Sequence, residues 1–155
     1  MINSNRAQHN LGHLYQYGIG TEKDEELAVE WYTRSAAAFN AFAMHSLGYC
    51  YQHGIGVEIN EERAFKLYLE SAKLDHSPAQ LVLANCYRNG TGTDISDTEA
   101  FYWIKKSASA ENDVAQNTLG HFYEDGIGCT QDLDQAAYWY KLSSQQGNLW
   151  YFFYT

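Results

Sequence analysis

Histidines that recur at helical spacing are the side chains of this sequence best suited to bind a metal ion. His9 and His13 lie four residues apart and His45 and His53 eight apart, so each pair would share one face of a helix. Imidazole is a common ligand of Zn²⁺. The sequence has no H-E-x-x-H string, however, and neither pair has an obvious carboxylate beside it to complete a site. We interpret these histidines as residues of polar helix faces and expect no metal and no other cofactor.

Phosphate binding and nucleophilic catalysis are two further chemistries that the sequence could support. Gly-x-Gly occurs four times, but the third glycine of a dinucleotide fingerprint is missing, no strand pattern precedes the pairs, and no Gly-Lys-Ser/Thr follows them. The sequence also contains no Gly-x-Ser-x-Gly and no Ser-x-x-Lys. We therefore expect that the chain is not an enzyme, and a metal-binding or enzymatic protein is the less favoured alternative.

The Gly-x-Gly pairs recur every 36 residues, at Gly18/Gly20, Gly54/Gly56, Gly90/Gly92 and Gly126/Gly128. The same register aligns one leucine, one tyrosine and two alanines in every copy. These residues are Leu11, Leu47, Leu83 and Leu119; Tyr15, Tyr51, Tyr87 and Tyr123; Ala7, Ala43, Ala79 and Ala115; and Ala28, Ala64, Ala100 and Ala136. A fixed period of this length is typical of repeat proteins. It predicts four units, of about residues 4–39, 40–75, 76–111 and 112–147, which build one repeat domain over residues 1–146.

Each unit is expected to hold two helices, because apolar and small residues recur at the helical period on both sides of its Gly-x-Gly pair. The first glycine of a pair can adopt the left-handed conformation that ends the first helix, and the second lets the chain reverse. Residues that accept hydrogen bonds from free helix N–H groups precede the second helices, namely Asp24, Asn60, Ser96 and Asp132. Ser96 and Glu99 also form a capping-box pattern. The sequence thus predicts an all-α fold of helix-turn-helix units.

The packing of these helices can also be anticipated from recurring residue types. Small residues at Gly12, Gly48, Ala84 and Gly120, with the Ala28 series, would let the two helices of a unit approach closely. Recurring aromatic residues of the second helices are expected to be buried between neighbouring units: Trp31, Trp103, Trp139, Tyr32, Tyr68 and Tyr140. Cys50 and Cys86 occupy equivalent places and are expected to be buried, inert thiols.

Composition excludes several classes of partner. Hydrophobic residues make up 45% and aromatic residues 15% of the chain, which is too apolar for intrinsic disorder. The net charge of -9 leaves no basic surface for nucleic acid or anionic lipid. No apolar run is long enough to cross a membrane, and three cysteines, an odd number, favour a reducing compartment. We expect a cytoplasmic protein that binds no nucleic acid and does not insert into membranes.

The recurring residues resemble those of the Sel1-like repeat family, also called HCP-like, which is related to the tetratricopeptide repeats. The matching strings of the second unit are Ala43-x-x-x-Leu47-Gly48-x-x-Tyr51-x-x-Gly54-x-Gly56-Val57 and Ala64-x-x-x-Tyr68-x-x-Ser71-Ala72, and the resemblance covers residues 4–146. It implies an α-solenoid, a right-handed superhelix whose concave surface, formed by the first helices, holds partner proteins. Members of the family act as adaptors and are not generally enzymes. Some secreted members connect the two helices of a unit by a pair of cysteines, which no unit of this chain contains.

Positions that differ between units are free to recognise a partner. On the predicted first helices the outward positions are polar with aromatic character, and we call them the stripe: His9, His13, Tyr17, His45, Tyr49, His53, Leu81, Asn85, Asn89, Asn117, His121 and Asp125. We expect a protein-interaction scaffold or adaptor that binds a partner protein or peptide here, and Glu124 with Asp125 indicates basic residues on that partner. Two alternatives stay open. The stripe could be a merely solvated face, and the chain could be a structural fragment of a longer repeat protein.

The aromatic tail, residues 147–155, does not continue the repeat faithfully. It begins where a fifth first helix would start, but it is short and has Tyr151 where the other units have alanine. Trp150, Phe152 and Phe153 carry large apolar surfaces. We expect the tail to fold back over the last helix pair as a cap, with a truncated fifth repeat or self-association through these rings as the alternatives.

Overall fold

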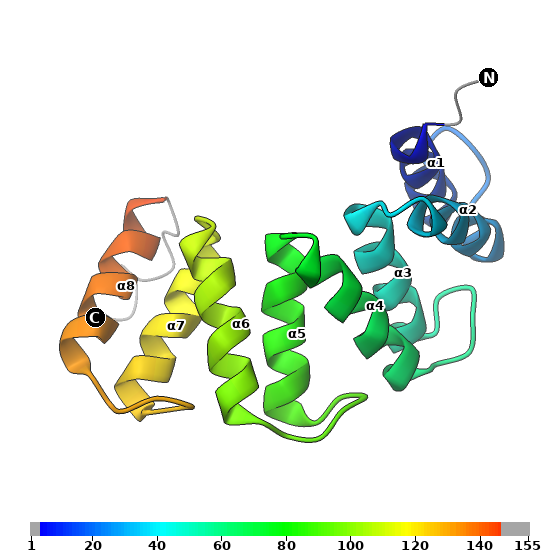
Figure 1. The fold of residues 1–155 in the computed structure, drawn as a ribbon. Coiled ribbons are helices and arrows are strands. Elements are labelled where there is room, and N and C mark those ends of the chain that lie inside the picture. Colours follow the sequence, from blue (N-terminus) through cyan, green and yellow to red (C-terminus); the bar gives the residue numbers. More distant parts are fainter. Residues whose placement is uncertain (1–3, 147–155) are drawn as a thin grey trace.

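The computed structural model describes residues 4–146, which form eight helices of 13 residues each and contain no strand (Figure 1). The helices are α1 (Asn5–Tyr17), α2 (Glu25–Ala37), α3 (Ala41–His53), α4 (Glu61–Lys73), α5 (Ser77–Asn89), α6 (Asp97–Ser109), α7 (Asp113–Asp125) and α8 (Leu133–Gln145). The odd-numbered helices are the first helices of the four units and the even-numbered helices are the second. The predicted all-α repeat fold is confirmed.

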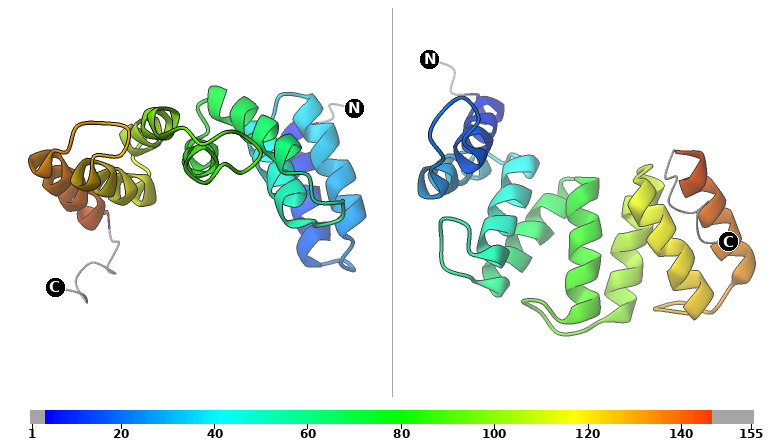
Figure 2. Two further views of the ribbon diagram at one scale, coloured as in Figure 1. Left: turned by 90° about the horizontal axis from the view of Figure 1, so that it is seen from below. Right: turned by 180° about the vertical axis from the view of Figure 1, so that it is seen from behind.

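The helices follow one another along a curved row, with α1 and α8 at its opposite ends (Figures 1 and 2). Each helix packs against the next helix in the chain, both within a unit and between units. The array therefore has the neighbour-to-neighbour packing of a solenoid. The predicted cap, residues 147–155, lies outside the described residues.

The ends of the helices are capped largely as the sequence predicts. Each first helix ends at a C-terminal capping glycine in the left-handed conformation, with φ between 64° and 71°. These glycines are Gly18, Gly54, Gly90 and Gly126. Asp24, Asn60, Ser96 and Asp132 accept backbone N–H groups from the first turns of the second helices. The reciprocal half of the capping box is absent, because the Ser96 N–H donates to the Tyr87 carbonyl oxygen at 2.9 Å instead.

That bond from the capping residue to a tyrosine carbonyl recurs in all four units and connects the two helices of each unit. A second recurring bond does the same at the other end of the helix pair. Its donors are four serine hydroxyls, at most 3% exposed, and its acceptors are carbonyl oxygens in the first turn of the first helix: Ser35 to Asn5, Ser71 to Ala41, Ser107 to Ser77 and Ser143 to Asp113. Each helix pair is thus fixed at both ends by bonds to the backbone, which change little with side-chain identity elsewhere.

A glycine on the first helix gives room to a tyrosine on the second helix of the same unit. A Cβ atom added at Gly48 would lie 2.9 Å from the Tyr68 ring, and one added at Gly12 would lie 2.7 Å from the Tyr32 ring. The third unit has Ala84 at the glycine position and the smaller Ile104 at the tyrosine position. The added methyl group and the lost ring thus occur together, which indicates that the two positions fill one volume. Tyr32 and Tyr68 also belong to core clusters with residues of the next unit, so the expectation that they are buried between units is confirmed for these two, although each also lies over a glycine of its own unit.

The second glycine of three of the four loops lies very close to the backbone of the preceding unit. At Gly56, Gly92 and Gly128, an added Cβ atom would overlap the carbonyl oxygen at the start of the preceding second helix, on Glu25, Glu61 and Asp97 respectively. These glycines also have positive φ angles between 65° and 70°. Gly20 has φ 73°, but nothing lies within 4 Å of the position of its Cβ. Conformation alone explains Gly20, whereas the other three are also required by the approach of one unit's backbone to the next.

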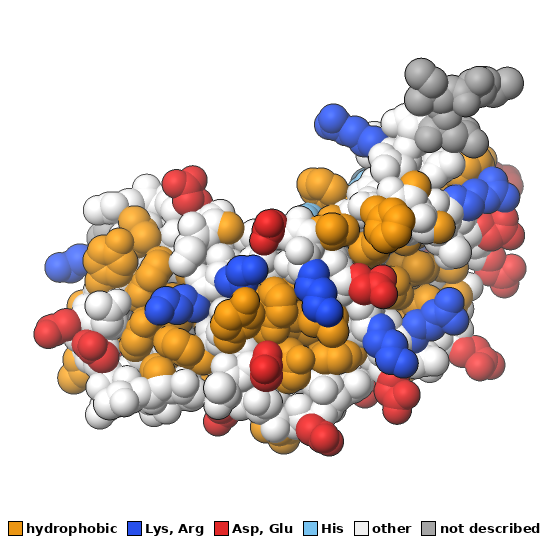
Figure 3. Space-filling model, in the orientation of Figure 1, with side chains coloured by type: hydrophobic (Ala, Val, Ile, Leu, Met, Phe, Trp, Pro, Cys, Tyr) orange, Lys and Arg blue, Asp and Glu red, His pale blue; other side chains and the backbone are white. Residues whose placement is uncertain are grey.

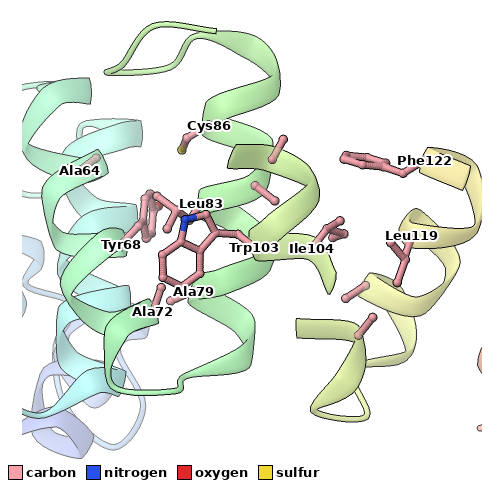
Figure 4. Packing of buried hydrophobic residues seen from close by; sticks show 14 residues of the cluster. Ala64, Tyr68, Ala72, Ala79, Leu83, Cys86, Trp103, Ile104, Leu119 and Phe122 are labelled. Carbon is pink, nitrogen blue, oxygen red and sulfur yellow. The ribbon is translucent and has the colours of Figure 1, made fainter. Parts of the chain in front are cut away.

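The core runs along the array between these contacts. In the middle of the row Tyr68 of α4, Leu83 of α5 and Trp103 of α6 pack together (Figure 4). Cys50 and Cys86 are buried and form no disulfide, so the prediction of buried free thiols is confirmed. Trp103 is buried as expected, while Trp31 and Trp139 are half-buried.

Comparing Gly92→Ala with Gly20→Ala tests the contact between units. The left-handed conformation costs alanine about 1 kcal/mol at either position. Gly92→Ala adds an overlap with a helix backbone that cannot move independently, so we expect it to destabilise the fold by about 3 kcal/mol or more. Urea unfolding measures both values. Equal effects of the two substitutions would contradict the proposed role of Gly92.

Gly48→Ala tests the glycine–tyrosine packing. Alanine favours the helix by about 1 kcal/mol, but the crowding against the buried Tyr68 ring outweighs this gain, and we expect a net loss of about 1–2 kcal/mol. Combining Gly48→Ala with Tyr68→Ile reproduces the pair of the third unit. The double variant should therefore lose less free energy of unfolding than the sum of the single variants. Simple additivity would show that the two positions do not share a volume.

Candidate interaction surface

The stripe separates into three rows along the first helices. The row nearest the helix N-termini, His9, His45, Leu81 and Asn117, is half-buried. The other two rows, His13, Tyr49, Asn85 and His121, then Tyr17, His53, Asn89 and Asp125, are exposed. Eight of the stripe side chains therefore face solvent. Of the remaining four, His9, His45 and Leu81 pack against neighbouring residues, and Asn117 is only partly exposed.

The histidines of the half-buried row lie at the joints between units. The His9 ring packs on the Tyr32 ring at 5.5 Å between centroids, and its Nε2 atom lies 3.1 Å from the Ser46 hydroxyl in the next unit. The His45 ring lies 5.7 Å from the Tyr68 ring and 5.3 Å from the His76 ring in the third unit. Both imidazoles thus contact the neighbouring unit while remaining partly exposed at the surface.

Exposed rings gather on the first two units. His13 packs against Tyr17 at 4.7 Å, and Tyr49 packs against His53 at 4.2 Å. Tyr17 and Tyr49 come from neighbouring first helices and line the same hollow of about 290 Å³. The structure therefore brings the aromatic residues of the first two units into one surface.

The stripe of the last two units has a different character. Within residues 4–146, the side chains of Asn85, Asn89 and Asn117 form no hydrogen bond. The fold therefore does not use their amide groups. His121 is engaged instead, since its Nδ1 atom lies 2.7 Å from the Tyr140 hydroxyl. The Tyr140 hydroxyl also donates to the carboxylate of Glu124, a neighbour of the stripe, at 2.6 Å. Asp125, the acidic residue of the stripe itself, forms no side-chain hydrogen bond within residues 4–146.

Phe42 and Phe39 belong to the same surface but were missed by the sequence analysis. Phe42 is 61% exposed and Phe39 is 78% exposed, and with Arg6 and His9 they line a hollow of about 570 Å³ between α1 and α3. Phe42 packs on His76 at 4.5 Å. The helical spacing could have identified Phe42, because it lies one turn before His45 on the same face. Phe39 is in a left-handed conformation, with φ 59°, that its sequence does not reveal.

Burial controls the ionisation of the histidines at the joints. It lowers the pKa of His45 to about 4, with repulsion from protonated His76 and His9 as smaller causes. Burial likewise lowers the pKa of His9 and His76. The three imidazoles are therefore neutral in the folded chain near pH 7.

Metal binding and covalent chemistry find little support in this geometry. Within residues 4–146, no three His, Cys, Asp or Glu side chains come together in a way that could hold a metal ion. Burial raises the pKa of the Cys50 and Cys86 thiols to about 11, which disfavours the reactive thiolate. None of the described helices has the length and apolar character needed to cross a membrane.

The stability of the array should fall in mild acid because of His45. The unfolded chain binds a proton there with a pKa near 6.5, and the folded chain does so only near 4. The contribution of neutral His45 to the free energy of unfolding is therefore complete above about pH 6.5 and is lost as the pH falls toward 4. At pH 5 we expect a loss of about 2 kcal/mol relative to pH 8 from this residue.

His45→Leu, which introduces the residue of the third unit at this position, is the matched variant. Urea unfolding at several pH values should show a shallower acid-side decline for His45→Leu than for the wild type. Parallel pH profiles would contradict the assignment.

The family model of the Sel1 repeat matches residues 5–38, 41–76, 77–112 and 113–148, one match for each helix pair. Among curated proteins, no sequence match was found. Solved structures do match. A Sel1 repeat protein from Oxalobacter formigenes has a TM-score of 0.89 and 28% identity, over 95% of this chain and 60% of that one.

A second solved structure is c5321, a protective antigen of uropathogenic Escherichia coli strains with an SLR fold. It has a TM-score of 0.91 and 32% identity, over 95% of this chain and 32% of that one. Cysteine rich protein B of Helicobacter pylori, at 19% identity and a TM-score of 0.64, over 81% of this chain and 90% of that one, shares the fold. The chain thus spans 60% and 32% of the first two proteins. The four matched units, each with its glycine-capped helix pair, show that the chain belongs to the Sel1 repeat family.

Proposed function

We propose that the chain is a protein-interaction scaffold that binds a partner protein or peptide along the stripe. Sel1 repeats commonly serve as scaffolds for protein interactions. The observation that carries the proposal is the set of exposed rings on the first two units. Tyr17 is 56% exposed and Tyr49 is 43% exposed, and both line one hollow. Large rings that are exposed and grouped are the usual anchors of protein interfaces.

The contrast between recurring and variable positions supports this assignment. Tyr15, Tyr51, Tyr87 and Tyr123 are identical in the four units, and their carbonyl groups accept the bonds that fix each helix pair. The stripe differs from unit to unit, and the fold makes no such repeated use of its exposed side chains. These side chains are therefore free to match a partner rather than to hold the array together.

The chemistry of the stripe changes along the array, and the partner should change with it. Tyr17, Tyr49 and Phe42 offer apolar contact area at the first two units. Asn85 and Asn89 offer amide groups that can pair with a peptide backbone. Asp125 favours a basic residue at the far end. An extended or helical segment with apolar side chains at one end and basic ones at the other fits this order.

The remaining parts of the proposal follow the same reasoning. We propose no enzymatic activity and no cofactor for the scaffold. We also propose that it binds no nucleic acid, because its net charge of -9 disfavours a polyanion. We place it in the cytoplasm, where the three free thiols would stay reduced. A part of a longer array is the second candidate, favoured by the partial span of two similar proteins.

Replacing Tyr49 and His53 together by alanine tests the stripe. These two rings pack on each other and are exposed, so we expect the melting temperature to change by no more than a few degrees while partner capture from native cell extract falls strongly. Trp103→Ala should instead destabilise the array by about 3–5 kcal/mol, since it removes a buried ring.

Tyr138→Ala is the matched surface control, because Tyr138 is an exposed ring on a second helix, α8. It should leave both capture and melting temperature unchanged. If the Tyr49 and His53 variant captures the same proteins as the wild type, recognition lies elsewhere. If it unfolds as Trp103→Ala does, the stripe belongs to the core.

A further inference from the structure

A pocket of about 740 Å³ lies on α6, a second helix, on a part of the surface that does not carry the stripe. Its wall is the exposed side of α6 with Phe101, Tyr102, Lys105 and Lys106, and its far edge is formed by Asp75 and Gln80. Figure 3 shows a hydrophobic area with Lys and Arg side chains at its border over the middle of this face, over α5 and α6. The pocket thus combines apolar walls with positive charge in a chain that is acidic overall.

The lysines of the pocket are held close to aromatic rings. The Lys105 Nζ atom lies 5.9 Å from the centre of the Phe101 ring, and no carboxylate within residues 4–146 forms an ion pair with it. Lys106 lies 5.5 Å from the Trp103 ring and 3.7 Å from the Asp75 carboxylate. Asp75 therefore neutralises one lysine, and the positive charge of Lys105 stays available beside an exposed ring, Tyr102, which is 52% exposed.

The other units do not repeat this combination. The positions of Phe101, Tyr102, Lys105 and Lys106 are taken in α8 by Ala137, Tyr138, Lys141 and Leu142, and in α4 by Phe65, Lys66, Leu69 and Glu70. Two rings and two lysines together occur in α6 alone among the four second helices. Because the repeat fold itself does not require them, their combination indicates a specific use.

A buried acceptor at the edge of the pocket has no partner. Gln80 is 2% exposed, and its Nε2 atom donates to the Ala72 carbonyl oxygen at 3.1 Å. Its Oε1 atom has no hydrogen bond within residues 4–146. The equivalent Gln116 makes the same bond to Ala108, but its Oε1 atom also accepts from the Gln146 amide at 3.2 Å.

The residue that corresponds to Gln146 in the third unit is Ala110, which has no amide and lines the pocket. The third unit thus lacks a side-chain donor for Gln80 like the one that Gln146 provides for Gln116 in the fourth unit. An unmet buried acceptor costs free energy, and a donor that enters the pocket would recover it.

We propose that this pocket binds a peptide segment that presents an aromatic side chain beside a carboxylate. The ring packs on Phe101 and Tyr102, and the carboxylate pairs with Lys105. A backbone N–H group of the peptide, with a small adjustment of the Gln80 side chain, supplies the donor that Gln146 supplies to Gln116. One short peptide carries all three groups at adjacent positions. This site is separate from the stripe and does not depend on the function proposed for it.

The test is a titration of the ¹⁵N-labelled full chain, followed by its amide NMR shifts. The probe is the blocked peptide acetyl-Gly-Phe-Asp-Gly-amide, and its control is the same peptide with Asn in place of Asp. We expect saturable shifts at residues 75–80 and 98–110 with the first peptide, and binding weaker by about fivefold or more with the second. The double variant of Tyr49 and His53 should bind the probe as the wild type does.

Substitutions with matched controls in α8 locate the site. Lys105→Glu should weaken binding by about tenfold, while Lys141→Glu, the equivalent change in the fourth unit, should leave it unchanged. Tyr102→Ala should likewise weaken binding, and Tyr138→Ala should not. Ala110→Gln should supply the missing amide donor to Gln80. It should therefore raise the stability of the free chain and weaken the binding of the peptide.

Several results would overturn the proposal. They are an absence of saturable shifts, equal binding of the two peptides, or equal effects of Lys105→Glu and Lys141→Glu. Shifts spread over the exposed rings of α1 and α3 would assign the peptide to the stripe instead. Circular dichroism of each variant shows whether it is folded, and a folded variant with unchanged affinity counts against the residue replaced.

Discussion

Successive units of this chain depend on a contact between backbones. Gly56, Gly92 and Gly128 bring each loop against the start of the preceding second helix, so closely that even a methyl group would overlap a carbonyl oxygen. Bonds from capping residues and from buried serines then fix the two helices within each unit. Because these contacts use main-chain atoms and very small residues, they specify the array while leaving most outward side chains unconstrained. That freedom is the physical basis of the function we propose.

The third unit shows how far the repeat can vary without losing its geometry. It exchanges a glycine and a tyrosine for Ala84 and Ile104, and it has Ala110 where the fourth unit has Gln146. The first exchange preserves the filled volume, whereas the second leaves the Gln80 acceptor without a partner. The packing of the fold is sufficient to explain the substitutions that preserve the filled volume. Those that leave a polar group unsatisfied beside a pocket require a different explanation, and a bound ligand provides one.

Most of the fold could be predicted because its signals are local and occur four times. Left-handed glycines, helix caps and the 36-residue period depend only on neighbouring residues. The sequence analysis was wrong or incomplete where a residue had two possible partners in space. The Ser96 N–H binds the Tyr87 carbonyl rather than Glu99, and Tyr32 contacts Gly12 of its own unit as well as the next unit. Helical spacing predicted the outward position of most stripe residues, but the burial of His45 and the pocket on α6 arise only when neighbouring units meet.

The central claim is that the first helices bind the partner while the contacts between units only hold the array. Hydrogen exchange of the chain, measured free and in complex with a protein that co-purifies with it, tests this claim most directly. Our account predicts that binding slows exchange in peptides from α1 and α3 and leaves those from α2 and α4 unchanged. Slowing confined to the second helices, with α1 and α3 unaffected, would contradict it.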